Sequence, residues 1–311
     1  MDELEIRYRP ALASPAMIMG LTGWMDGGSV STGTVGYLID RLGATDFAQI
    51  SPLDFYILNF PVAAVPLSIQ ASEGKAVLTA VSPMEMAAVF RPHTRIEDGV
   101  IQELTFPRNR FFCAEGANVV LFLGEEPHIR WGAYSECLLR LAEELRITEV
   151  YFIGSVAGML PHTREPRLRA SVAADHLKGR LEGLDVGYSR YKGPASLITF
   201  LCHHSLERGI GLRSLVVEVP HYPFVEMSAY PRSILKTTSA LNDLLSLGLD
   251  LADLRRAAEA VEGKLNSLAE ENETFRELVA KLEEAYDGEE LGPDEELLKR
   301  LMEGIDPDQF A

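Results

Sequence analysis

Short apolar runs alternate with amphipathic stretches over most of the chain. The apolar or β-branched runs are typical of buried strands and span residues 16–21, 47–50, 119–123, 150–154 and 214–219. The amphipathic stretches have helical spacing and span residues 29–42, 131–145 and 197–206. Parallel neighbours need crossovers, and helical crossovers cover the sheet. The alternation therefore predicts an α/β fold: a three-layer domain with a mixed, mainly parallel sheet.

Two regions depart from this alternation. Residues 52–107 are rich in proline and contain strand-like pieces at 77–81 and 101–106, which predicts a β-rich, antiparallel insertion. After residue 248, two apolar stripes at helical spacing predict a helical hairpin with a break near 271–272. We therefore divide the chain into an α/β core domain (1–247), a C-terminal helical hairpin (248–288) and an acidic tail (289–311).

Composition and charge exclude several classes of function. The net charge of the 311-residue chain is −17, which argues against a general nucleic-acid binder, because such binding relies on Lys and Arg. Residues 248–311 carry 19 acidic and 7 basic residues, so the acid is concentrated at the C-terminal end. No apolar run approaches the roughly 20 residues that span a bilayer, and the N-terminal residues are acidic, so we expect a cytoplasmic protein with no membrane partner. The three cysteines, Cys113, Cys137 and Cys202, lie far apart along the chain, so we expect neither structural disulfides nor a zinc site.

The first candidate site is the glycine-rich turn 23–28, between the first predicted strand and helix. Trp24, Asp26, Gly27 and Gly28 lie in it, and free N–H groups at the following helix start suit an anion. The turn lacks the spacing of nucleotide-triphosphate and dinucleotide loops, so we expect neither ATP nor NAD, and no cofactor. A structural alternative is that Asp26 caps the helix and Trp24 covers the core.

Further polar side chains follow other predicted strands. They are His128 with Arg130, His162 with Arg164, and His221 with Tyr222. Ligands of open α/β sheets bind beyond the carboxyl ends of strands, so these residues and the turn are candidate ligand-binding residues on one rim. Alternatively they are surface and capping groups. Ser155, in Gly-Ser-Val-Ala-Gly, is a weak candidate nucleophile, and the histidine spacing does not favour a metal site.

Several strand-end phrases resemble the proteasome assembly chaperone two family of bacteria and archaea. They are Gly-Trp-Met-Asp-Gly-Gly from residue 23, Glu-Pro-His-Ile-Arg-Trp from 126, Pro-His-Thr-Arg from 161, Ser-Arg-Tyr-Lys-Gly-Pro from 189 and Val-Pro-His-Tyr from 219. The resemblance covers roughly residues 15–287. It implies a fold similar to nucleoside phosphorylases and related hydrolases, a C-terminal helical element and homo-oligomers, often trimers. Some members end in a hydrophobic residue, Tyr and one last residue that docks into the proteasome. Here the end is Gln309-Phe310-Ala311, so we expect no docking through a phenol.

Two functions follow from these patterns. The first is an uncharacterised homo-oligomeric assembly factor or scaffold, expected as a trimer with a protein partner and without an assigned reaction. The second is a small-molecule enzyme or sensor with a phosphorylase-like pocket for a nucleoside-like or anionic metabolite. In that second function the amides of Gly27 and Gly28, with Arg130 or Arg164, hold the anion, and His128 or His221 protonates a leaving base. The catalytic residues are left unassigned.

Overall fold

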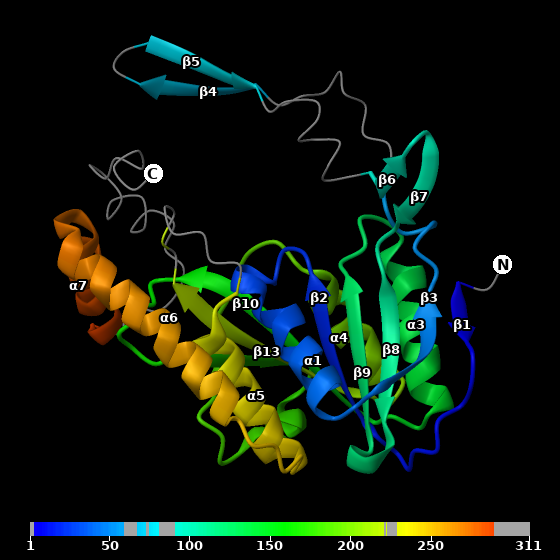
Figure 1. Ribbon diagram of the computed structural model, residues 1–311. Coiled ribbons are helices and arrows are strands. Elements are labelled where there is room, and N and C mark those ends of the chain that lie inside the picture. The colour runs from blue at the N-terminus through cyan, green and yellow to red at the C-terminus, as the bar shows by residue number, and fades with distance from the viewer. Residues whose placement is uncertain are drawn as a thin grey trace.

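The computed structural model describes residues 3–58, 67–72, 75–80, 91–220, 222 and 229–288. These residues form a nine-stranded mixed sheet with helices on both faces (Figure 1). In spatial order its strands are β1 (Leu4–Ile6), β3 (Thr45–Ile50), β8 (Asn109–Ala114), β9 (Val119–Glu125), β2 (Ala16–Thr22), β10 (Glu149–Gly158), β13 (Gly211–Pro220), β11 (Leu168–Val172) and β12 (Gly187–Tyr188). The predicted α/β fold is confirmed.

The centre of the sheet is parallel. Strands β9, β2, β10 and β13 pair in parallel, so their carboxyl ends share one edge of the sheet. Strand β3 runs antiparallel to β8, which runs antiparallel to β9, so β3 also ends at this edge. We call it the carboxyl edge.

Each central strand contributes to two cores, which explains the continuous apolar runs. In β2, Met17 and Met19 pack into the core under helices α3 (Trp131–Glu144) and α4 (Leu197–Glu207). The intervening Ile18 packs into the opposite core, under α1 (Val30–Arg41) and α5 (Pro231–Leu245). Successive strand residues point to opposite faces, so a sheet covered on both sides needs apolar residues at every position.

Helix α5 lies outside the stretches in which the sequence predicted helices. Its buried face includes Ser233, Thr237 and Thr238 beside Ile234 and Leu241, so its apolar stripe is interrupted by small polar residues. The hydroxyls of Thr237 and Thr34 lie 2.7 Å apart between α5 and α1. This hydrogen bond offsets the free-energy cost of burying the two hydroxyl groups.

Two helices occupy the C-terminal region in which the sequence predicted a hairpin. Helix α6 (Ala252–Glu271) packs against α5, and α7 (Glu273–Asp287) packs against α6 at the left of Figure 1. Asn272 separates the two helices, and its side chain caps α7 by accepting from the Phe275 N–H at 2.9 Å. The proposed domain boundary at residue 248 falls between α5 and α6, and the proposed tail lies outside the described residues. None of the helices in the described part is long and apolar enough to cross a bilayer.

Two antiparallel pairs lie in the region predicted to be β-rich. They are β4 (Leu67–Ser72) with β5 (Lys75–Ala80), and β6 (His93–Glu97) with β7 (Val100–Thr105). The β6–β7 hairpin stands beyond the carboxyl edge in Figure 1, and almost all of its residues are exposed.

Candidate functional site

The turn after β2 is held together by its own side chains. Asp26 accepts from the backbone N–H of Thr32 at 3.1 Å and from the Thr32 hydroxyl at 2.8 Å, so its carboxylate caps the first turn of α1. Burial raises the pKa of Asp26, and the hydrogen bonds from Thr32 oppose that shift. Gly28 has a φ of 58°, a conformation that glycine adopts without strain. The carboxylate of Asp26 thus satisfies a helix-start N–H, as in the structural alternative.

Ser155 of β10 completes this turn. Its hydroxyl donates to the Gly27 carbonyl at 2.7 Å, and its backbone N–H donates to the Met25 carbonyl at 2.8 Å. A Cβ on Gly27 would lie 3.2 Å from the Val219 side chain. Ser155 therefore joins β10 to the turn, and its hydroxyl hydrogen is used in that contact.

Glu126 is an organising residue that the sequence reasoning did not single out. Its carboxylate accepts from the Trp24 N–H at 3.3 Å and from the N–H of Leu197, the first residue of α4, at 3.2 Å. Trp24 itself is 58% exposed and does not cover the core. The sequence showed Glu126 as the first residue of the phrase Glu-Pro-His-Ile-Arg-Trp, but gave it no role of its own.

His128 and Arg130 bind neighbouring loops. His128 Nδ1 accepts from the Ile57 N–H at 3.1 Å, and burial lowers the pKa of its imidazole. Arg130 pairs with Glu3 at 3.0 Å and with Asp54 at 3.6 Å. Both residues thereby fix the segments around β1 and the end of β3.

His162 and Tyr222 come together in a buried cluster under the C-terminal helices. The Tyr222 hydroxyl accepts from the backbone N–H of His162 and lies 2.8 Å from His162 Nδ1. His162 Nε2 lies 3.1 Å from Asn266 Oδ1 in α6, and Phe275 of α7 stacks on the His162 ring. We call His162, Tyr222, Asn266 and Phe275 the clasp.

The clasp geometry accommodates a neutral His162. Because the oxygen of Tyr222 already accepts from a backbone N–H, its hydrogen is available to donate to Nδ1. The ring hydrogen then sits on Nε2 and donates to Asn266. Burial lowers the pKa of His162, which favours the neutral imidazole in this arrangement.

Arg164 binds α7 beside the clasp. Its guanidinium donates to both carboxylate oxygens of Asp287, at 3.0 and 2.8 Å, and to Glu283 at 2.9 Å. The predicted candidate His221 lies outside the described residues. The pair His162 and Arg164 therefore attaches the C-terminal helices to the loop after β10.

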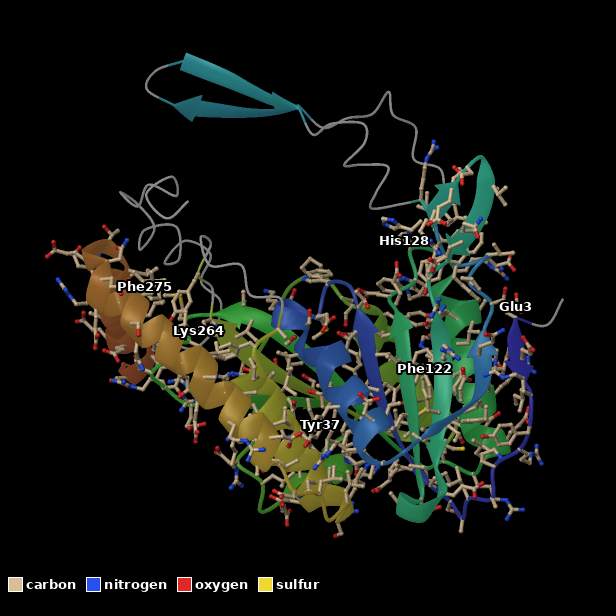
Figure 2. All side chains as sticks on the ribbon, in the orientation of Figure 1. Glu3, Tyr37, Phe122, His128, Lys264 and Phe275 are labelled. Atoms are coloured by element: carbon tan, nitrogen blue, oxygen red, sulfur yellow. The ribbon has the colours of Figure 1, made fainter. Side chains whose placement is uncertain are left out.

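The candidate residues follow strands that end at the carboxyl edge, but they do not form one pocket. In Figure 2, His128 lies near the β6–β7 hairpin, whereas Phe275, which stacks on His162, lies at the opposite side of the molecule. A separation seen in projection cannot be smaller in space. The structure thus unites His162 with Tyr222 and separates them from His128.

Large apolar side chains are exposed along the same edge. Trp24, Leu53, Ile57 and Ile129 follow strands β2, β3 and β9, and each is at least 36% exposed. We call these four residues the apolar edge. The His128 Nδ1 contact to the Ile57 N–H places Ile57 beside the segment that carries Ile129.

The β6–β7 hairpin adds an apolar face of its own. Thr94 pairs with Leu104 and Ile96 pairs with Ile101, and a register shift between them leaves Gln102 as an extra residue on β7. Directly opposite residues share a face, and Thr94 and Ile96 share one by alternation. The bulge therefore brings Leu104 and Ile101 to the same face as Ile96. Ile96, Ile101 and Leu104 form this hairpin face, and each is more than half exposed.

Comparison with known proteins indicates the same family as the strand-end phrases of the sequence. The PAC2 family profile matches residues 20–269. No curated protein matches the chain.

Solved structures share the fold. A PAC2 family protein from Streptomyces avermitilis is 24% identical with a TM-score of 0.63, covering 82% of this chain and 95% of its own. A proteasome-assembly chaperone homologue from Mycobacterium tuberculosis is also 24% identical, with a TM-score of 0.64 and coverage of 81% and 94%. An archaeal proteasome activator from Pyrococcus furiosus is 20% identical, with a TM-score of 0.56 and coverage of 86% and 99%. The family resemblance of the sequence is confirmed, and the chain belongs to the PAC2 family.

Proposed function

We propose that this chain is a homo-oligomeric, non-enzymatic assembly factor that binds protein partners through the hairpin face and the apolar edge. The observation that carries the proposal is the exposure of Ile96, Ile101 and Leu104 together on a projecting hairpin. Two-stranded hairpins are only marginally stable alone in water, so a partner over this face would stabilise it.

The hairpin face is large enough to matter energetically. Full burial of an Ile or Leu side chain contributes about 1.5–3 kcal/mol. Scaled by the exposed fractions of 55–66%, the three side chains would contribute roughly 3–5 kcal/mol on contact with a partner. The apolar edge would extend such a contact.

Relatives support a role in assembly. The similar structure from Mycobacterium tuberculosis is a proteasome-assembly chaperone homologue, and the one from Pyrococcus furiosus is a proteasome activator. By resemblance to this family we propose a homotrimer in the cytoplasm. The net charge of −17 favours protein partners over nucleic acid.

The alternative, an enzyme or sensor for a nucleoside-like or anionic metabolite at the turn 23–28, has less support. Its anion would need the N–H groups at the start of α1, and the Asp26 carboxylate already accepts from one of them. Of the two proposed proton donors, His128 already accepts from the Ile57 N–H through Nδ1, and His221 lies outside the described residues.

The oligomeric state tests the proposal. Light scattering after size exclusion should give a trimer for the full chain. The double substitution Ile96→Ser with Ile101→Ser should raise the dissociation constant of the complex between the chain and its protein partner by about 50-fold or more, since each tenfold change corresponds to about 1.4 kcal/mol. Native mass spectrometry of proteasome subunits from the same source, mixed with the chain, should show a complex that the double variant weakens.

A matched control lies on the same hairpin. Arg95 and Glu103 pair on the other face, at 3.9 Å, so Glu103→Gln should leave the complex with the protein partner unchanged. A wild-type chain that is monomeric at all concentrations and forms no complex with the subunits would contradict the proposal. So would equal weakening by the Glu103 control and the double variant.

A further inference from the structure

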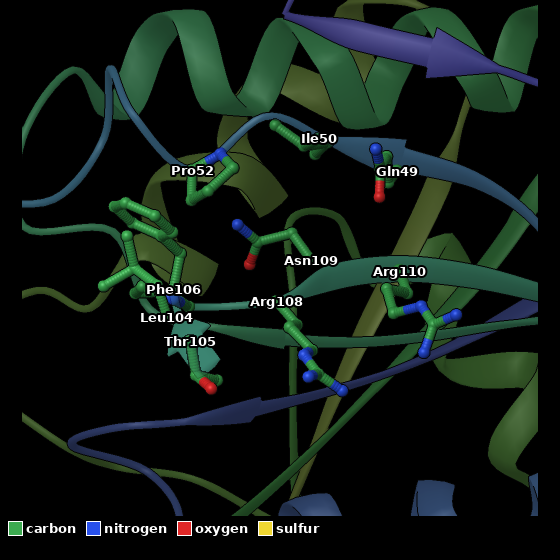
Figure 3. Close-up of a pocket in the computed structure, with 10 residues that line it drawn as sticks. Gln49, Ile50, Pro52, Leu104, Thr105, Phe106, Arg108, Asn109 and Arg110 are labelled. Atoms are coloured by element: carbon green, nitrogen blue, oxygen red, sulfur yellow. The ribbon is translucent and has the colours of Figure 1, made fainter. Parts of the chain in front are cut away.

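A cavity of about 340 Å³ opens between the end of β3 and the start of β8, at the foot of the β6–β7 hairpin. None of the residues predicted as candidates lines it. Its apolar wall comprises Ile50, Pro52, Leu104, Phe106 and Pro107 (Figure 3). Its volume is within the range of small-molecule sites, at the lower end.

Asn109 lies among the lining residues, and its amide has a fixed orientation. The backbone N–H of Glu125 donates to Asn109 Oδ1 at 3.0 Å, and an N–H group can only donate. The hydroxyls of Tyr56 and Tyr134 approach the same oxygen, each at 2.9 Å. The nitrogen Nδ2 must therefore point away from these three groups.

That nitrogen is a buried donor without an acceptor in the described part of the chain. Asn109 is 1% exposed, and its Nδ2 has no hydrogen-bond partner among the described residues. Leaving a buried donor unsatisfied costs about 1–3 kcal/mol. Figure 3 shows the Asn109 amide between Pro52 on one side and Phe106 and Arg108 on the other.

Two arginines line the cavity, and they differ in their partners. Arg110 forms an ion pair with Asp46, which also binds Arg7. Arg108 is exposed and pairs with no carboxylate among the described residues. Two further polar side chains line the cavity: the Gln49 amide donates to Glu5 at 2.7 Å, and the Thr105 hydroxyl donates to Glu103 at 2.9 Å. The cavity therefore offers one guanidinium that no carboxylate of the described chain neutralises.

We propose that this cavity binds a small organic monocarboxylate with an apolar body. The carboxylate pairs with the guanidinium of Arg108, and the apolar body packs on Pro52, Leu104 and Phe106. A guanidinium suits a carboxylate because its N–H groups match both oxygens. A single charge fits better than the double charge of a phosphate ester, because Glu5 and Asp46 lie nearby and the whole chain is acidic.

Ligand-detected and protein-detected NMR on the full chain test this site with phenylacetate, benzoate and 4-methylpentanoate as probes. At least one should bind with a dissociation constant of about 1 mM or tighter. It should shift signals of residues 104–110 and 49–52. Phenylacetamide and inorganic phosphate, tested alongside, should bind at least about tenfold more weakly, a difference of about 1.4 kcal/mol.

Arg108→Gln should weaken probe binding by about tenfold or more, and Arg108→Lys by less. The matched control is Arg95→Gln, an exposed arginine of the β6–β7 hairpin that does not line the cavity. Because Arg108 is exposed, its replacement should leave the melting temperature unchanged. Absence of binding by all three carboxylates, equal binding of phenylacetamide, or equal affinity in the Arg108→Gln and Arg95→Gln variants would each overturn the proposal.

Discussion

Replacing Tyr222 by Phe should destabilise the protein by removing one hydroxyl from the clasp. The ring keeps its edge contact with Phe275, whose centroid lies 4.9 Å away, so packing changes little. The backbone N–H of His162 then loses its acceptor, and Nδ1 loses its donor. Since Tyr222 and His162 are 3% and 1% exposed, water does not replace the hydroxyl without rearrangement.

The magnitude follows from the two orphaned groups. A buried donor or acceptor left unsatisfied costs about 1–3 kcal/mol, so the two together should lower the free energy of unfolding by roughly 2–6 kcal/mol. Urea denaturation followed by circular dichroism measures this difference. In the Tyr222→Phe variant, hydrogen exchange should accelerate relative to wild type more in α6 and α7 than in the strands. Tyr188→Phe, at an exposed tyrosine, is the matched control and should change stability by less than about 0.5 kcal/mol.

The same cluster predicts a pH dependence with a definite sign. Burial lowers the pKa of His162, so between its folded value and the unfolded value of about 6.5 the unfolded chain binds more protons. Stability from this group is therefore present above about pH 6.5 and is lost as the pH falls toward the folded pKa. Asp26, with a raised pKa, contributes in the opposite direction, so comparison of wild type with His162→Gln isolates the histidine. A Tyr222→Phe variant as stable as wild type, or an unchanged pH profile in His162→Gln, would refute the assignment of a neutral imidazole.

Three further substitutions follow from the structure. Gly20→Ala would place a Cβ 2.5 Å from the Ser31 carbonyl oxygen, so unfolding should become easier by about 1–3 kcal/mol in urea titrations, whereas Gly36→Ala meets nothing within 4 Å and should stabilise α1. Asp26→Ala should lower the denaturation free energy by about 1 kcal/mol through loss of the cap, with Asn at the same position restoring most of it. Inorganic phosphate that protects wild type against heat but not the Asp26→Ala variant would instead favour an anion site at the turn. Arg164→Ala should speed proteolytic removal of α7, measured by mass spectrometry of timed digests; an unchanged cleavage rate would show that the contacts to Asp287 and Glu283 do not retain the helix.

The sequence predicted the central strands because their chemistry is local. Alternate residues such as Ile18 and Met19 enter different cores, which leaves a continuous apolar run that is visible without a structure. Helix α5 was not predicted because its buried face carries Thr237, a polar residue. The hydroxyl of Thr237 is hydrogen-bonded to Thr34, which lies about 200 positions away along the chain. A polar residue on a buried face looks like a surface residue until its partner is known.

The candidate site was less predictable for a related reason. The sequence placed His162 at the end of a strand, but its partner Asn266 comes from α6, and the stacking Phe275 comes from α7. The motif letters around Asp26 were compatible with an anion site and with a helix cap, and only the contact with Thr32 shows which groups the carboxylate binds here. The hairpin face depended on a bulge at Gln102, which no periodicity in the sequence reveals.

The position of β13 has a consequence for synthesis on the ribosome. Strand β11 joins the sheet through β13 on one side and carries β12 on the other, yet β13 follows both along the chain. Until residues 211–220 leave the exit tunnel, the β11–β12 pair has no place in the sheet, and the β10 edge that receives β13 stays open. A nascent chain stalled before residue 211 should therefore expose an unpaired apolar strand edge, which is the kind of surface that general chaperones bind and that promotes aggregation.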